Sequence, residues 1–260
     1  SGTIEAVNAE PHDANIRGAI CAERAAMCVF QRDEAAKGSR VVRVVCVTDR
    51  KNCIYPGPLC REFLTATCEP CTEVISSGTG DSNSWESLEL AELLPLPSVY
   101  RRRDQGDIKS FGEALQKKAT APEDKSLKAA YEAAVAKACK QVAQATVFPV
   151  LFGAAVCFED GRVHSAAELK GMEYGCTVDA VTLLLPEMQR AKEDGLAKAV
   201  CIVQADQYGV AHAPFAAARA LLVEHGFGDV LVSAHGDDGK WVSSMPVKDT
   251  LPHYGCGSIF

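Results

Sequence analysis

The sequence predicts an α/β protein made of two tandem α/β/α units, each a mixed sheet with helices packed on it. Two short apolar runs, 42–47 and 197–202, are rich in β-branched residues and are typical of buried strands. Helical segments alternate with such runs in both halves of the chain, as they do in an α/β sheet. Two cysteines 25 residues apart also recur in each half, which indicates a degenerate internal repeat. The pairs are Cys21 with Cys46 and Cys176 with Cys201.

In the first unit the pattern predicts three helices and two strands. The helices are expected over 21–37, 60–67 and 85–93, and the strands over 40–48 and 72–76. Cys21 and Cys60 therefore each stand at the start of a helix. The backbone N–H groups and the positive dipole end at such a position stabilise a thiolate over a thiol.

The second unit begins with two elements that the first unit lacks. An alanine-rich amphipathic helix is expected over 125–145 and an apolar strand over 147–158. Either the chain begins inside a domain, so that the start of the first unit is truncated, or another element fills the gap. The predicted domains are 1–104 and 125–260, joined by a polar linker over 105–124.

Length and composition describe an ordinary globular protein. Of the 260 residues, 47% are hydrophobic and 23% charged, so the chain can bury a sizeable core. The net charge of -7 argues against a nucleic-acid partner, because phosphate contacts need clustered Lys and Arg. The longest apolar stretch is too short for a membrane span and the first residues contain no secretory signal, so we expect no membrane partner and a cytoplasmic location. In that compartment the twelve cysteines suggest reduced thiols or metal ligands.

Four short motifs follow one another along the first unit. They read Asn-Ala-Glu at 8–10, Cys-Ala-Glu-Arg at 21–24, Cys-Arg-Glu at 60–62 and Glu-Leu-Leu-Pro at 92–95. In this order and spacing the chain resembles the cytidine deaminase family of zinc hydrolases, where a ligand two residues before a glutamate opens one helix and further cysteines open the next. The resemblance covers all of the first unit and, more faintly, the second, and it implies a cytidine-deaminase-like fold for both.

The resemblance also implies a zinc cofactor and a set of site residues. These are Cys21 and Cys60 as zinc ligands, Glu23 as the catalytic residue, Asn8 and Glu10 as substrate-binding residues, and Arg24 and Arg61 as neighbours of the ligands. The two arginines would donate hydrogen bonds to sulfur and offset the negative charge of the thiolates.

The third zinc ligand is where this sequence departs from the family. Three residues before Cys60, where the family has its second ligand, the chain has Gly57. Cys53 is the candidate replacement, because the segment 53–60 resembles the wider-spaced cysteine pairs of riboflavin-pathway deaminases. Against Cys53, the stretch 49–57 has about the family's usual length, which implies no insertion. Zinc needs three protein ligands and a water for hydrolysis, so this ligand decides whether the site is active.

The implied reaction is hydrolytic deamination of cytidine or deoxycytidine to uridine or deoxyuridine, as in pyrimidine salvage. A zinc-bound hydroxide would attack C4 of the ring, and Glu23 would shuttle protons to N3 and to the departing amino group. One alternative is a catalytically inactive pseudoenzyme that acts as a binding or scaffolding subunit. Another is a deaminase of RNA, DNA or a different aminated ring, which the acidic charge disfavours.

The second unit is expected to be degenerate. Counting from Cys176 places Val178 where the catalytic glutamate belongs, and Ala218 replaces the cysteine at the start of the next helix. A catalytic unit fused to an inactive one resembles the long-chain cytidine deaminases, whose two-domain subunits pair as homodimers. The resemblance thus implies a homodimer that acts on a small pyrimidine nucleoside.

Overall fold

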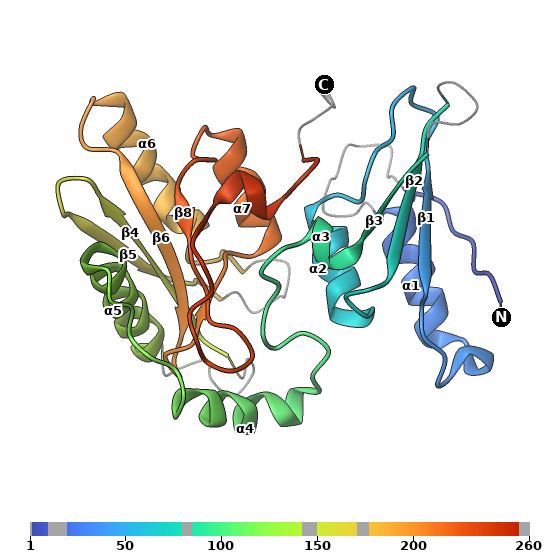
Figure 1. Cartoon of the computed structure of the whole chain (residues 1–260), viewed down its shortest axis with the longest axis horizontal. Helices are drawn as coiled ribbons and strands as arrows, with labels where there is room; N and C mark the ends of the chain where they lie inside the picture. The colour runs from blue at the N-terminus through green and yellow to red at the C-terminus, as the bar shows by residue number, and fades with distance from the viewer. Residues whose placement is uncertain (1, 10–19, 80–84, 142–149, 171–176, 255–260) are drawn as a thin grey trace. The chain divides into compact units, whose positions relative to one another are not determined.

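The computed structural model describes residues 2–9, 20–79, 85–141, 150–170 and 177–254. The chain separates into two compact units: unit 1 is Ser1–Pro95 with Leu251–Phe260, and unit 2 is Leu96–Thr250 (Figure 1). Both units are mixed α/β, which confirms the predicted fold class. Ten cysteines lie in the described ranges and none of these ten forms a disulfide bond. Among the same residues, no helix has the length and apolar character that a membrane span requires.

Unit 1 is a three-stranded sheet with its helices packed on one face. Its elements are α1 (Ala22–Arg32), η1 (Glu34–Ala36), β1 (Arg43–Val47), α2 (Pro58–Thr67), β2 (Glu73–Ser77), β3 (Trp85–Glu89) and α3 (Leu90–Leu93). The strand order is β1-β2-β3, with β1 parallel and β3 antiparallel to β2. Met27 of α1, Leu64 of α2 and Val74 of β2 belong to one buried core. This core holds α1 and α2 against the same face of the sheet.

The prediction of a helix over 85–93 is wrong for its first half. Residues 85–89 form β3, in which Leu88 lies opposite Val74 of β2, and the helix starts only at Leu90. Pairing with the edge of β2 overrides the helical preference of the glutamates and leucine in this segment. A capping box between Glu89 and Glu92 then begins α3, because the Glu92 carboxylate accepts a hydrogen bond from the Glu89 backbone N–H at 2.7 Å.

Unit 2 contains a larger sheet that is covered on both faces. Its elements are α4 (Gln105–Gln116), α5 (Lys125–Cys139), β4 (Phe152–Phe158), β5 (Val163–Ala167), η3 (Thr182–Leu184), α6 (Leu185–Glu193), β6 (Ala199–Asp206), β7 (Ala211–His212), α7 (Ala216–Glu224), β8 (Leu231–Val232), β9 (Met245–Pro246) and η4 (Val247–Thr250). The strand order is β5-β4-β6-β8-β9, and β7 also pairs with β6. Helices α6 and α7 contribute to the core on one face, and α5 covers the other.

The limits of the units differ from those in the sequence prediction. The predicted linker contains α4, whose residues Ile108, Phe111 and Leu115 recur at helical spacing and pack with Val150 and Val210 inside unit 2. The polar composition around these three residues concealed the apolar face. At the other end, the chain from Leu251 onward belongs to unit 1.

The two units repeat one topology, with an offset of 158 residues. Val44 pairs with Val74 in unit 1, and Ile202 pairs with Val232 in unit 2. The offset of 155 between Cys46 and Cys201 is therefore not the structural one. The reason is that apolar strand residues are interchangeable, so a shift of a few residues in a strand leaves the sequence pattern almost unchanged.

This offset corrects the residue equivalences in unit 2. Isolated bridges join Ala9 to Ile20 in unit 1 and Leu169 to Val178 in unit 2, so Val178 takes the place of Ile20 and not of Glu23. Asp179 then takes the place of Cys21, and its Oδ1 accepts hydrogen bonds from the backbone N–H groups of residues 181 and 182. Cys176 itself lies outside the described residues.

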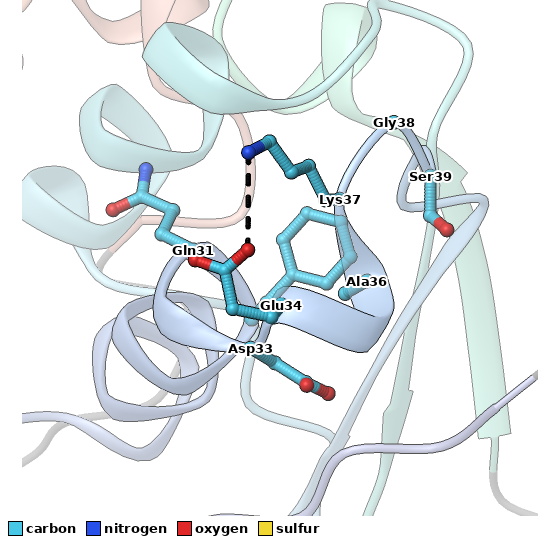
Figure 2. Close-up of a pocket in the computed structure, with 8 residues that line it drawn as sticks. Gln31, Asp33, Glu34, Ala36, Lys37, Gly38 and Ser39 are labelled. Atoms are coloured by element: carbon cyan, nitrogen blue, oxygen red, sulfur yellow. Dashed lines mark ion pairs between the residues drawn. The ribbon is translucent and has the colours of Figure 1, made fainter.

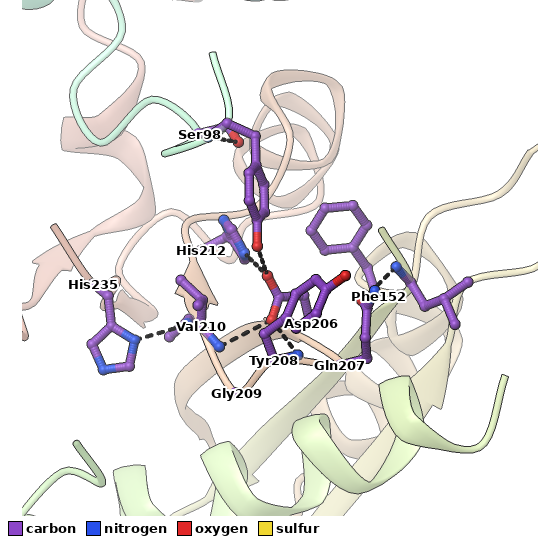
Figure 3. A network of polar contacts seen from close by, with 12 residues as sticks. Ser98, Phe152, Asp206, Gln207, Tyr208, Gly209, Val210, His212 and His235 are labelled. Atoms are coloured by element: carbon purple, nitrogen blue, oxygen red, sulfur yellow. Dashed lines mark hydrogen bonds and ion pairs between the residues drawn. The ribbon is translucent and has the colours of Figure 1, made fainter. Parts of the chain in front are cut away.

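A buried polar network lies at the end of β6 in unit 2 (Figure 3). The Asp206 carboxylate accepts hydrogen bonds from the Tyr100 hydroxyl at 2.6 Å and from His212 Nε2 at 2.9 Å. Beyond it, His235 Nδ1 accepts from the Ala211 backbone N–H at 2.9 Å, and His235 Nε2 lies 3.1 Å from the carbonyl oxygen of Thr120. Nε2 must therefore carry the proton, and the network holds the His235 ring in its neutral form.

Unit 2 should lose stability in mild acid because of His235. Burial lowers the pKa of this ring below its ordinary value of 6.5. Just below that pH, His235 therefore binds a proton in the unfolded chain but not in the folded chain. The free energy of unfolding should fall as the pH drops below about 6.5, by at most about 1.4 kcal/mol per pH unit for one proton. Urea unfolding, followed by Trp241 fluorescence in a Trp85→Phe background, measures this slope. His235→Gln should flatten it, whereas His225→Gln, at an exposed histidine, should not; equal slopes in all three proteins would contradict the assignment.

Candidate metal centre

Cys21, Glu23 and Cys60 form a group of potential metal ligands in unit 1. Their ligand atoms all lie within 4.8 Å of one another. Cys21 is the N-cap residue of α1, Glu23 lies in the first turn of that helix, and Cys60 lies in the first turn of α2. The sequence prediction that both cysteines stand at helix starts is confirmed, and the fold brings the two starts together.

Local sequence features fix both helix starts. The Asn8 side-chain oxygen accepts a hydrogen bond from the Ala22 backbone N–H at 2.7 Å and so caps α1. Pro58 is the first residue of α2, where its fixed φ suits the helix and its missing N–H costs nothing. Asn8, expected to bind substrate, thus positions the helix that carries Cys21 and Glu23.

The charges of the group favour a cation. Burial raises the pKa of the Cys60 thiol, and the negative charges of Glu23 and Cys21 raise it further. Arg24 Nη2 donates a hydrogen bond to Cys21 Sγ at 3.7 Å, and this bond raises the pKa of the guanidinium. The Arg24 guanidinium therefore lies against Cys21, and its single positive charge is too small to neutralise Glu23 together with both cysteines in their thiolate forms.

Cys46, which marks the internal repeat in the sequence, is a neighbour of the site. It lies on β1, on the face that carries Val44 and packs toward the helices. Burial and then the charge of Glu23 raise the pKa of its thiol to about 12. The two-residue alternation of β1 was the signal that places Cys46 on the inner face.

The donor set fits zinc in its chemistry. Zinc prefers thiolate, imidazole and carboxylate ligands, and a tetrahedral ion with Zn–S bonds of about 2.3 Å holds its two sulfurs about 3.8 Å apart. Cys21 and Cys60 satisfy that condition with small side-chain adjustments, since their sulfurs already lie within 4.8 Å of each other. Glu23 supplies the third donor in reach.

The other described residues of the predicted ligand segment do not join this group. Cys53 is described but is not a member of the Cys21, Glu23 and Cys60 group. Gly57 is the N-cap residue of α2, and a Cβ built on it would meet nothing within 4 Å. Glu10 lies outside the described residues.

Arg61 is directed away from the sulfurs and toward backbone carbonyl groups. It is 1% exposed and donates hydrogen bonds to the carbonyl oxygens of Pro56 at 2.7 Å, Leu93 at 2.9 Å and Pro252 at 2.7 Å. Burial lowers its pKa to about 10, which still leaves it charged at neutral pH. Arg219 makes the equivalent contacts in unit 2, to the carbonyl oxygens of Pro214, Leu96 and Thr250. Arg61 is therefore a structural anchor for α2 and for the returning chain.

Arg61→Met should destabilise unit 1 by at least about 3 kcal/mol, because three buried carbonyl groups each lose a partner at a cost of about 1–3 kcal/mol. Urea unfolding, followed by Trp85 fluorescence in a Trp241→Phe background, measures the loss. Arg40→Met, at an exposed arginine of the same unit, is the control and should change the midpoint little. If the two variants are equally stable, the three carbonyl contacts do not carry the stability assigned to them.

A pocket of about 260 Å³ lies at the far end of α1 (Figure 2). It is lined by residues around η1, including Phe30, and an ion pair of 3.8 Å between Glu34 and Lys37 crosses it. Both charged side chains are exposed. Since α1 is 11 residues long, or about 16 Å, this pocket is separate from the group that contains Cys21.

The fold and the site together define an α/β unit with a Cys-Glu-Cys group at two helix starts. No protein-family model matches the sequence, and no curated protein matches it. Among solved structures, the chain is similar to cytidine deaminase from Mycobacterium tuberculosis, at 22% identity over 50% of this chain and 96% of that chain, with a TM-score of 0.40. It is also similar to cytidine deaminase from Mycobacterium leprae, at 22% identity over 50% and 99% of the two chains and a TM-score of 0.39. It is similar as well to cytidine deaminase from Burkholderia pseudomallei, at 20% identity over 57% of this chain and 97% of that chain, with a TM-score of 0.32.

Proposed function

We propose that unit 1 is a zinc-dependent deaminase that hydrolyses cytidine or deoxycytidine to uridine or deoxyuridine. The observation that supports this most is the convergence of Cys21, Glu23 and Cys60 at the starts of two helices. Two thiols next to a carboxylate can hold a divalent ion and leave an acid beside it, which is what hydrolysis of an aminated ring needs.

In this proposal Cys21 and Cys60 hold the zinc, with Cys53 as the third ligand after a movement of its loop. The ion would act as a Lewis acid, which makes water reactive at neutral pH. Glu23, as a carboxylate, takes the proton of the attacking water and passes protons to ring nitrogen N3 and to the leaving amino group. Arg24 holds Cys21 in place through its hydrogen bond to sulfur. Asn8 keeps the first turn of α1 formed, and Glu10 binds the sugar.

Metal analysis of the purified chain tests the zinc site. We expect about one zinc per chain, and a sharp drop in Cys53→Ser if Cys53 is the third ligand. Cys71→Ser is the control, since Cys71 is an exposed cysteine of unit 1 that lies outside the Cys21, Glu23 and Cys60 group. The loss of cytidine absorbance on deamination then measures turnover by the zinc-loaded protein. Zinc-loaded protein that leaves cytidine and deoxycytidine unchanged would refute the proposed reaction.

A second candidate function is a catalytically inactive subunit that binds a nucleoside or another protein. The observation that favours it is the third ligand: Gly57 offers no side chain, and Cys53 lies outside the Cys21, Glu23 and Cys60 group. Protein that contains no zinc after purification with added zinc, yet still binds cytidine, would establish this alternative.

The two units differ at the positions of the proposed zinc ligands. Unit 2 has Ala218 where unit 1 has Cys60 and Asp179 where unit 1 has Cys21, so we assign catalysis to unit 1 alone. We further propose a homodimer that works in the cytoplasm in pyrimidine salvage. Sedimentation of the purified chain tests the dimer.

A further inference from the structure

Cys21 and Cys60 are two thiols that lie next to each other at the starts of α1 and α2. Their sulfur atoms lie within 4.8 Å of each other. A disulfide bond requires the sulfurs to approach to about 2.05 Å. Cys21 is the N-cap residue of α1 and precedes its first helical residue, so its side chain can turn toward Cys60 without breaking a helical hydrogen bond. The pair can therefore close a disulfide through a movement of side chains.

The two sulfurs differ in their access to solvent. Cys21 is partly exposed, whereas Cys60 is 1% exposed. Arg24 Nη2 donates a hydrogen bond to Cys21 Sγ at 3.7 Å, and the same guanidinium interacts with Cys60. Reactive cysteines sit in partly exposed places beside a positive charge. A soluble oxidant therefore meets Cys21 first, and Cys60 lies within reach for a second step.

A pair of cysteines in unit 2 shows the opposite situation. Cys157 of β4 lies directly opposite Cys201 of β6 in the sheet. Both are buried, at 1% and 5% exposure, in the core that α5 covers. Neither of these sulfurs is open to an oxidant, and buried structural cysteines are inert. The access at Cys21 is what distinguishes the pair in unit 1.

We propose that Cys21 and Cys60 form an oxidation site, at which a small soluble disulfide such as oxidised glutathione converts the two thiols into a Cys21–Cys60 disulfide. The Cys21 thiolate attacks one sulfur of the oxidant, whose S–S bond breaks and releases one glutathione thiolate. Cys60 then loses its proton to solvent and attacks the Cys21 sulfur of the mixed disulfide, which releases the second glutathione. The two protein thiols lose two electrons and two protons, and the oxidant gains both.

The disulfide and zinc exclude each other, and in this respect the inference rests on the proposed function. Zinc binds thiolates, and the disulfide removes the thiolates of Cys21 and Cys60 together. Gly57 has no side chain to replace them, so Cys53 and Glu23 are the donors that remain. Conversely, bound zinc holds both sulfurs and blocks their oxidation. Oxidation therefore turns off the zinc-dependent activity, and a thiol reductant restores it.

Peptide mapping of the full chain tests the oxidation site. The chain is freed of zinc with a chelator, incubated with oxidised glutathione, blocked with N-ethylmaleimide and digested with trypsin without reduction. Cys21 lies in the tryptic peptide 18–24 and Cys60 in the peptide 52–61, which also contains Cys53. In a Cys53→Ser background we therefore expect a cross-link between these two peptides, and it should disappear on reduction.

Variants at the two cysteines separate the two steps of the reaction. Cys60→Ser should stop at the mixed disulfide, with one glutathione on the peptide 18–24, and Cys21→Ser should give neither product. Cys28→Ser is the control, since Cys28 is an exposed cysteine of the same helix outside the Cys21, Glu23 and Cys60 group, and it should leave the cross-link unchanged. In the chain with Cys53 intact, zinc at about 100 times its Kd should slow cross-linking about a hundredfold, because only about 1% of the chains are then free of metal.

Two results would overturn this inference. One is the absence of a cross-link between peptides 18–24 and 52–61 in the zinc-free Cys53→Ser protein, and the other is a cross-link that forms equally fast with zinc bound. Because the mapping involves no turnover, it separates this inference from the proposed function. A chain that binds zinc and deaminates cytidine yet forms no cross-link overturns this inference alone. A chain that cross-links but binds no zinc supports the oxidation site and refutes the zinc-dependent function.

Discussion

Replacing Gly57 by cysteine should tighten zinc binding at least about a hundredfold. Structural zinc sites with four protein ligands are worth roughly 10–16 kcal/mol, or about 3 kcal/mol for each ligand, and about 3 kcal/mol corresponds to a factor of more than 100 in affinity. The parent chain offers two thiols and one carboxylate within reach of a single ion. A thiolate at position 57 therefore adds a ligand that is in place from the start, whereas Cys53 can join the two thiols only after its loop moves.

The backbone conformation and the surroundings of Gly57 allow a cysteine side chain at this position. Its φ of -66° and ψ of 168° are ordinary extended values that any residue adopts, and a new Cβ would meet nothing within 4 Å. As the N-cap residue of α2, position 57 directs its side chain over the first helical turn. Cys60 lies in that turn, so a sulfur at position 57 can approach the same ion.

Competition with a chromophoric zinc chelator measures the affinities of the parent, Gly57→Cys and Gly57→Ala proteins. The alanine variant adds a Cβ without sulfur and should bind zinc as the parent does. If Gly57→Cys and Gly57→Ala bind equally, position 57 does not face the metal. A parent that already binds as tightly as Gly57→Cys would instead show that the movement of Cys53 into the site costs no free energy.

The parts of the site that the sequence could predict are those fixed by local structure. Cys21 and Cys60 stand at helix starts, which the residue types and spacing of the sequence predict. Glu23 follows from Cys21 because two residues in one helical turn keep both side chains at the same end of α1. The sequence could not predict how close the starts of α1 and α2 lie. In the structure, the core around Leu64 and Val74 brings the two helix starts together.

The parts that the sequence missed depend on partners far away in the chain. Arg61 lies next to Cys60, yet its guanidinium bonds to the carbonyl oxygen of Pro252, 191 residues away, and no local pattern reveals that contact. The strand at 85–89 forms because β2 offers it an edge. The offset within the strands was also misjudged, since Cys46 and Cys201 suggest 155 whereas strand pairing gives 158.

Glu23→Gln should lower kcat by about 100-fold to 10,000-fold, the range that a positioned general acid–base group contributes. Glutamine has nearly the same shape but can neither take the proton of the attacking water nor deliver it to the ring. Cytidine deamination by zinc-loaded protein, with zinc content measured on the same samples, gives the effect per bound metal. Glu34→Gln, at an exposed acid just beyond α1, is the control and should keep full activity.

Measuring zinc and turnover together separates the two roles open to Glu23. The carboxylate lies within reach of the ion, so in the parent chain it can complete the ligand set or move protons, but a carboxylate bound to zinc is a poor base. If Glu23→Gln loses zinc as well as activity, Glu23 is a ligand and the proposed proton shuttle is wrong. In a Gly57→Cys background three thiolates hold the metal, so Glu23→Gln should then lower kcat with zinc content unchanged. We also expect the Gly57→Cys protein to be more active than the parent, because a third thiolate on the zinc leaves Glu23 free to transfer protons.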